Sequence, residues 1–154
     1  MRVRICAVGR MRAGPERELV ADYLGRFDRT GRPLGLGPAT VHEVEATGGM
    51  GPEGAALLRQ VPEGGLIVAL DERGETMGSP AFAARLAGWR DEGERDLCLL
   101  IGGADGLDAS VRARARTLLS FGAMVWPHLL VRAMLAEQLY RATTILAGGP
   151  YHRA

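Results

Sequence analysis

The stretch DLCLLIGGADGL, residues 96–107, decides the fold. Its opening residues form a short apolar run that ends on a glycine-rich turn, a pattern typical of a strand buried on both faces of a parallel sheet. A second run of this kind, LIVAL, occupies residues 66–70. A sheet buried on both faces needs helices on both sides. We therefore expect an α/β fold with a mostly parallel sheet covered by helices on both faces.

The chain on either side of these two runs alternates between strand-like and helix-like patterns, without repeats. We predict further strands at 2–9, 40–46 and 124–126, and helices at 16–29, 53–60, 79–92 and 109–118, with a last helix from His128 to the glycines at 148–149. Ser79 and Asp108 are the expected N-caps of two of these helices. A chain of 154 residues with this alternation is expected to form one domain, residues 1–154.

The composition, 47% hydrophobic and 24% charged, is typical of a soluble globular protein, and the apolar runs are too short to span a bilayer. The N-terminus has no secretory pattern, so we expect a cytoplasmic protein. A net charge of +1 argues against a simple basic clamp for RNA. All basic residues are arginine, which we interpret as codon bias in a GC-rich genome. Cys6 and Cys98 are predicted to be core residues rather than metal ligands.

Ligands of parallel sheets bind outside the carboxyl ends of the strands. The candidate loops are those after Leu70, after Ile101 and around residues 124–126. The glycines at 102, 103 and 106 would let a ligand approach the backbone closely, although a tight turn alone also explains them. The sequence contains no GxGxxG, no lysine for a Walker motif and no nucleophile elbow. These absences argue against dinucleotide enzymes, P-loop proteins and hydrolases.

The C-terminal stretch SFGAMVWPHLLVRAMLAEQLYRATTILAGGPYHR, residues 120–153, holds further candidates. Pro127 suits the start of a helix, on which His128 and Arg132, like Glu137 and Arg141, are four residues apart and are expected to meet on the surface. An aromatic ring, an imidazole and a guanidinium end the chain at residues 151–153. A solvent-exposed helix start and a frayed tail are the alternative interpretations.

Five motifs together resemble the ribosomal RNA large subunit methyltransferase H family: LDERG at 70–74, LLIGGADGL at 99–107, PHLLVR at 127–132, EQLYRA at 137–142 and PYHR at 150–153. The resemblance covers essentially the whole chain. It implies a SPOUT-class fold with a C-terminal trefoil knot and a homodimer. It also implies methyl transfer from S-adenosylmethionine to N3 of a pseudouridine in the inter-subunit stem-loop of large-subunit ribosomal RNA, with the assembled ribosome as substrate and without a metal.

The family pattern also implies site residues. The cofactor pocket would be formed by Leu70, Gly103, Gly122, Ala123, Met124, Val125, Trp126 and Pro127. Arg132, Arg141 and Arg153 would hold phosphate or stabilise charge on the base. His152 would be proton acceptor or orienting group, Tyr151 would stack on a flipped base, and His128 would shape the pocket. Family members often carry threonine and glutamine where this chain has Val125 and Leu129.

Two other functions fit parts of the sequence. A related knotted methyltransferase acting on transfer RNA or on another ribosomal base would share the cofactor loops, but the PYHR ending argues against it. A flavodoxin-like module without catalysis would use the glycine turn to bind a phosphate. An orphan structural protein is a third alternative.

Overall fold

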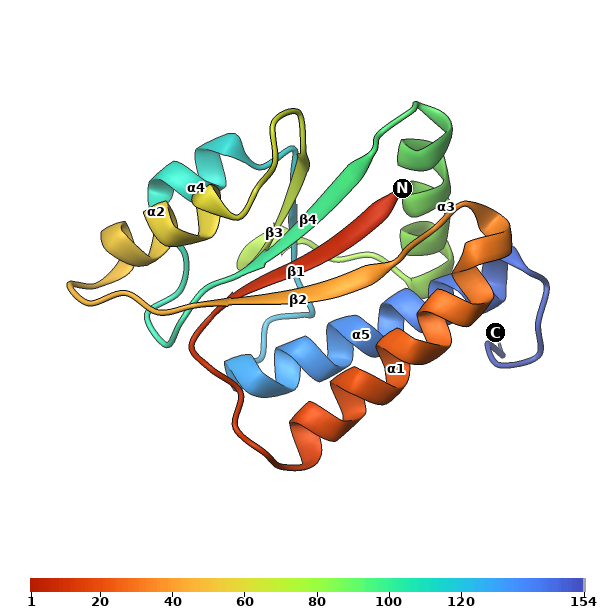
Figure 1. Cartoon of the computed structure of the whole chain (residues 1–154), viewed down its shortest axis with the longest axis horizontal. Coiled ribbons are helices and arrows are strands. Elements are labelled where there is room, and N and C mark those ends of the chain that lie inside the picture. Colours follow the sequence, from red (N-terminus) through yellow and green to blue (C-terminus); the bar gives the residue numbers. More distant parts are fainter. Residues whose placement is uncertain (154) are drawn as a thin grey trace.

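A computed structural model describes residues 1–153, and Figure 1 shows a parallel sheet with helices on both faces. The strands follow the order β2-β1-β4-β3-β5, and every neighbouring pair is parallel. Their bounds are Arg2–Val8 for β1, Ala39–Val44 for β2, Leu66–Glu75 for β3, Asp96–Ile101 for β4 and Thr117–Leu119 for β5. The predicted α/β fold is confirmed. The trefoil knot stays a prediction.

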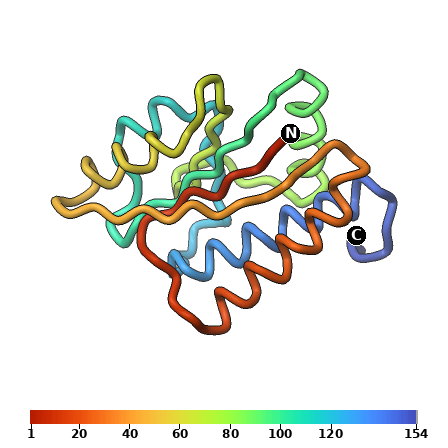
Figure 2. The backbone as a smooth tube through the Cα atoms, in the orientation of Figure 1, coloured from red at the N-terminus to blue at the C-terminus, as the bar shows by residue number. Residues whose placement is uncertain are grey.

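The helices form one layer on each face of the sheet. Helices α1 (Pro15–Gly31), α3 (Ser79–Asp91) and α5 (His128–Leu146) pack on one face, and α2 (Met50–Arg59) and α4 (Ala109–Arg114) pack on the other. A short 3-10 helix, Arg32–Leu34, follows α1. Helices α1 and α5 lie side by side (Figure 2), with the rings of Tyr23 and Tyr140 6.2 Å apart. None of the helices in residues 1–153 is long and apolar enough to cross a membrane.

The central strands are buried on both faces, as their apolar runs predict. In β4, Leu97 and Leu99 belong to the core under α1, α3 and α5, whereas Cys98 and Leu100 belong to the core under α2 and α4. Cys6 of β1 joins the second core, and burial raises the pKa of its thiol to about 12 and that of Cys98 to about 11. Both cysteines are core residues, as predicted.

The predicted strand at 124–126 and the end of the predicted helix at 109–118 are wrong. Helix α4 ends at Arg114, and residues 117–119 form β5, which pairs with β3 from Val68 onward. Residues 124–126 belong to an exposed loop, with Val125 85% exposed. Residues 117–119 and 124–126 are both short apolar runs, and the first of them, directly after α4, forms the edge strand. Apolarity alone does not distinguish them.

Two expectations for local structure have different outcomes. Asp108 caps α4 as predicted, because its side chain accepts a hydrogen bond from the Ser110 N–H at 2.8 Å. Ser79 does not cap α3: Gly78 occupies the N-cap position, and the Ser79 hydroxyl donates instead to Gln138 on α5 at 2.7 Å. The Ser79 side chain, which the local pattern assigns to the N-cap, makes a tertiary contact with α5 instead.

Arg132 does not lie on the surface of α5 beside His128, as the four-residue spacing predicted, but is fully buried. Its guanidinium donates to the carbonyls of Val8 at 2.6 Å and Gly9 at 2.8 Å, and to the Glu43 carboxylate at 3.1 Å. Burial lowers the pKa of Arg132, and Glu43 opposes this shift. One side chain thus links α5 to the carboxyl ends of β1 and β2.

Replacing this guanidinium with an apolar side chain of similar length tests its structural importance. Arg132→Met leaves the carbonyls of Val8 and Gly9 without this donor and removes the ion pair with Glu43, and we expect a loss of about 3–5 kcal/mol in the free energy of unfolding. Urea denaturation followed by circular dichroism measures it. The control, Arg114→Met, changes an exposed arginine and is expected to stay within about 0.5 kcal/mol of the parent protein. Equal stability of the two variants would contradict a structural role for Arg132.

Candidate functional site

A pocket of about 280 Å³ lies at the carboxyl edge of the sheet, where the second half of β3 meets the loops after β4 and β5. The loop predicted after Leu70 is wrong, because β3 continues to Glu75. Residues 70–73, 101–107 and 119–122 form most of its wall. Six of the residues predicted to bind a cofactor line it, together with one predicted catalytic residue. These are Leu70, Gly103, Gly122, Met124, Val125 and Trp126, with His128. Ala123 and Pro127 belong to the same loop of the chain.

The glycine turn after β4 brings bare backbone to this pocket. The Gly106 N–H donates to the Gly103 carbonyl at 3.1 Å, and the two residues form an isolated bridge. A side chain at Gly102 would overlap the Gly106 carbonyl, and a Cβ at Gly103 would lie 3.1 Å from the Glu53 carboxylate. The turn can be this tight only with glycine, and it leaves backbone atoms free to approach a ligand.

Of the charged residues that line this pocket, Asp71, Glu72, Arg73 and Asp105, the first is paired with the third. Asp71 is nearly buried and accepts hydrogen bonds from the Arg73 backbone N–H at 2.9 Å and from its guanidinium at 2.8 and 3.0 Å. The hydrogen bond from the Arg73 side chain lowers the pKa of this carboxyl. Asp71 therefore stays ionised and paired, and the remaining walls near Leu70 and Trp126 are apolar.

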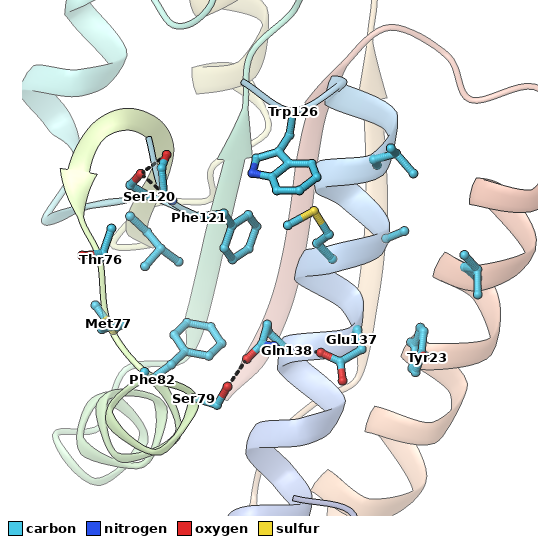
Figure 3. Close-up of a pocket in the computed structure, with 17 residues that line it drawn as sticks. Tyr23, Thr76, Met77, Ser79, Phe82, Ser120, Phe121, Trp126, Glu137 and Gln138 are labelled. Atoms are coloured by element: carbon cyan, nitrogen blue, oxygen red, sulfur yellow. Dashed lines mark hydrogen bonds between the residues drawn. The ribbon is translucent and has the colours of Figure 1, made fainter. Parts of the chain in front are cut away.

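A second, larger hollow of about 770 Å³ adjoins the first and shares Leu119–Gly122 and Trp126 with it. Figure 3 shows Phe82, Phe121 and Trp126 along it, with the hydrogen bond between Ser79 and Gln138 at its edge. Three of its lining residues are large apolar side chains with substantial exposure: Leu19 at 43%, Trp126 at 40% and Leu130 at 38%. Together with Met124 and Val125, they form an apolar surface around the two hollows.

A cluster around one carboxylate, Glu137, lies in the middle of α5, beside the larger hollow. Glu137 accepts both Nε and Nη2 of Arg141, at 3.0 and 2.7 Å, and the Tyr151 hydroxyl at 3.0 Å. The predicted contact between Glu137 and Arg141 is thereby confirmed. Arg141 also lies 4.8 Å from the centre of the Tyr151 ring and 3.3 Å from Nδ1 of His152. Burial raises the pKa of Tyr151.

The structure separates the predicted catalytic residues into different places. His128 lies at the pocket, and Arg132 is buried beneath the sheet edge. Arg141, Tyr151 and His152 belong to the cluster around Glu137. Arg153 is exposed beyond it. From His128 to Arg141 the helix rises about 20 Å. Within one chain, the tail and the predicted cofactor pocket are therefore apart.

Sequence reasoning missed Glu137 as a site residue, although its four-residue spacing from Arg141 pointed to a contact. It also missed Ser120, whose hydroxyl accepts from the Gly122 N–H at 3.1 Å and so shapes the pocket loop. Within residues 1–153, no group of three or more histidines, cysteines or carboxylates is placed to hold a metal ion.

The sequence and the fold of this chain are similar to those of known methyltransferases. A family model described as predicted SPOUT methyltransferase matches residues 1–152. Proteins named ribosomal RNA large subunit methyltransferase H from Dinoroseobacter shibae and Ruegeria pomeroyi are 66% and 65% identical over 155 residues, covering 99% of this chain and 99% of each relative. A solved structure, a probable methylase family protein from Haemophilus influenzae Rd KW20, aligns with a TM-score of 0.53 at 8% identity, covering 99% of this chain and 70% of that one. The last likeness concerns the fold alone.

The glycine turn can be tested by adding one methyl group. Gly102→Ala forces a side chain against the Gly106 carbonyl, and we expect the melting temperature to fall by roughly 5 °C. Gly88→Ala is the matched control, because Gly88 lies in α3 with open space around it. Alanine favours the helix, so this variant is expected to melt at or slightly above the parent temperature. Scanning calorimetry compares the two, and an unchanged melting temperature for Gly102→Ala would show that the turn has room to relax.

Proposed function

The chain belongs to the SPOUT methyltransferase family, and on this premise we propose that it methylates N3 of a pseudouridine in large-subunit ribosomal RNA. The methyl donor is S-adenosylmethionine and the substrate is the assembled ribosome, which places the protein in the cytoplasm. The observation that carries the proposal is the pocket formed by the glycine turn and the loop 119–126. The names of relatives that are 65–66% identical along their whole length support the choice of RNA.

The pocket residues suit a cofactor with a flat base and a sulfonium centre. Its volume of about 280 Å³ is close to the lower end of the range for small-molecule sites. Gly103 offers backbone without a side chain, and Leu70, Met124 and Trp126 offer apolar contact that excludes water. When bound, S-adenosylmethionine supplies the methyl group. The paired charge of Asp71 is not free to bind a competing cation.

The chemistry requires alignment more than acid or base strength. The N3–H of pseudouridine lies between two carbonyls, and its proton would pass to water, which leaves the nitrogen as the nucleophile. S-adenosylmethionine, when bound, would supply the methyl group and leave as the neutral thioether. Holding the two reactants in alignment supplies up to about 7–11 kcal/mol of the barrier. We assign this task to the pocket walls and to the tail residues Tyr151, His152 and Arg153.

Of the two roles predicted for His152, the contact with Arg141 favours orientation. An arginine has no acceptor, so the 3.3 Å contact requires Nδ1 of His152 to accept the hydrogen bond. A neutral ring then carries its proton on Nε2 and presents a donor, which suits a carbonyl of the target base. Glu137 holds Arg141 and Tyr151 in place for this purpose.

We propose a homodimer in which the tail of one chain meets the pocket of the other. Two observations support this arrangement. No member of the tail cluster lines the 280 Å³ pocket of its own chain, and Arg141 lies about 20 Å along α5 from His128. The apolar surface around the hollows, with Met124 73% and Val125 85% exposed, is typical of a surface that a partner covers. A two-fold dimer would bury this surface on both chains and complete two sites.

The reaction itself is tested with labelled S-adenosylmethionine and four substrates: intact ribosomes, separated subunits, naked ribosomal RNA and transfer RNA. We expect label in intact ribosomes, at N3 of one pseudouridine of the large subunit. Mapping the modified nucleotide by mass spectrometry identifies it. Label in transfer RNA would favour the related methyltransferase, and cofactor binding without any transfer would favour a module without catalysis.

The shared site is tested by mixing two inactive variants. Gly103→Val forces a side chain against Glu53 and Val8 and is expected to displace the glycine turn that lines the pocket. His152→Ala removes the tail imidazole. If each site combines two chains, the mixed dimer has one site with both parts intact, and a one-to-one mixture regains about a quarter of the parent activity. A site formed within one chain gives no recovery. Cofactor calorimetry and circular dichroism on each variant verify that the first has lost binding and that both are folded.

A further inference from the structure

We propose that the connection between β1 and α1, residues 9–14, is a rigid surface that binds RNA phosphates through Arg10 and Arg12. This inference rests on the proposed function, because it assigns part of the grip on the RNA substrate. It differs from the predicted role of Arg132 as a phosphate ligand. Arg132 is buried and instead holds this connection from below.

The connection is fastened at several points. The Gly9 N–H donates to the Val44 carbonyl at 2.8 Å, and the Gly9 carbonyl accepts from Arg132 at 2.8 Å. The Met11 N–H donates to the Glu43 carboxylate at 2.8 Å, and the Met11 side chain is only 6% exposed. A segment held by its backbone and by a buried side chain loses little further freedom when it binds a ligand.

Arg10 and Arg12 flank the buried methionine and are exposed. Among residues 1–153, no carboxylate lies within 4.0 Å of either guanidinium, nor of the exposed Arg17 that follows in α1. Many other surface arginines are paired with carboxylates, namely Arg2, Arg26, Arg73, Arg85, Arg90 and Arg116. The nearest acidic residues in sequence, Glu16 and Glu18, lie in the first turn of α1, where they complement the helix dipole.

This surface lies at the rim of the candidate site. A Cβ on Gly103 would be 3.2 Å from the Val8 side chain, so the end of β1 touches the glycine turn of the pocket. Arg10 follows two residues later, at most about 7 Å along the chain. Figure 2 shows the connection passing beside the first turn of α5, which begins at His128. RNA that reaches the pocket with a base therefore passes within reach of Arg10 and Arg12.

The chemistry favours a phosphodiester as the ligand. A guanidinium presents a planar fork of donors that matches two phosphate oxygens. With a net charge of only +1, the protein has little long-range attraction for RNA, so affinity must come from arginines placed at the contact. Two unpaired guanidiniums on a fixed backbone meet this need without sequence specificity, since phosphate contacts position the RNA while the pocket selects the base.

The test is a double variant, Arg10→Gln with Arg12→Gln, measured for methyl transfer to ribosomes and for equilibrium binding to ribosomes between 50 and 300 mM salt, on the order of the range in which phosphate contacts dominate. We expect the ribosome KM and Kd to rise about tenfold, with kcat and the affinity for S-adenosylmethionine unchanged. The slope of log Kd against log salt should fall by about two, one for each lost phosphate contact.

The matched control is Arg59→Gln with Arg95→Gln, which removes the same charge from two exposed arginines outside any ion pair between described residues. Arg59 is the last residue of α2, Arg95 directly precedes β4, and neither lines the pocket. Equal effects of the two double variants, or no effect of the first, would overturn the proposal while leaving the methyltransferase intact. Failure of the parent protein to bind or methylate any ribosomal RNA would instead overturn the proposed function, and this inference with it.

Discussion

A buried guanidinium holds together the parts of this molecule that matter for its site. Arg132 reaches from α5 to the carboxyl ends of β1 and, through Glu43, of β2. A buried charge is costly without partners, so this contact favours one position of α5 relative to the sheet. The pocket loop, residues 119–126, leads into α5, which begins at His128, one turn before Arg132. The connection after β1 begins at Gly9, whose carbonyl accepts a hydrogen bond from Arg132. Arg132 therefore helps to fix the positions of both loops.

The parallel sheet explains why distant motifs meet. Since β3, β4 and β5 run in the same direction, the second half of β3 and the loops after β4 and β5 meet at one edge. Glycines in the loop after β4 let the neighbouring segments approach its backbone closely. The apolar loop 122–126 is exposed in a single chain. The same geometry separates the tail from the pocket, because α5 carries the chain away from that edge. The proposed second copy of the chain would account for both features.

Much of the fold was predictable because its signals are local. The apolar runs at 66–70 and 96–101 are buried on both faces as expected, and α5 begins at His128 after Pro127. Residues 124–126 are misassigned because an exposed apolar run has the same sequence pattern as a short buried strand. Arg132 was misassigned because no pattern in the sequence distinguishes a buried arginine from an exposed one. The partner of such a residue, here the end of β1, is more than a hundred residues away.

The two buried cysteines allow the opening of the sheet to be measured. Cys6 and Cys98 lie in the two adjacent central strands, with both thiols fully covered. A thiol reagent in solution reaches them only when the sheet opens, so the labelling rate under native conditions reports the free energy of that opening. Movements of the pocket loop or the tail leave the rate untouched. Slower labelling after a ligand is added would thus reveal that the ligand steadies the whole sheet, whereas an unchanged rate would confine its influence to the loops.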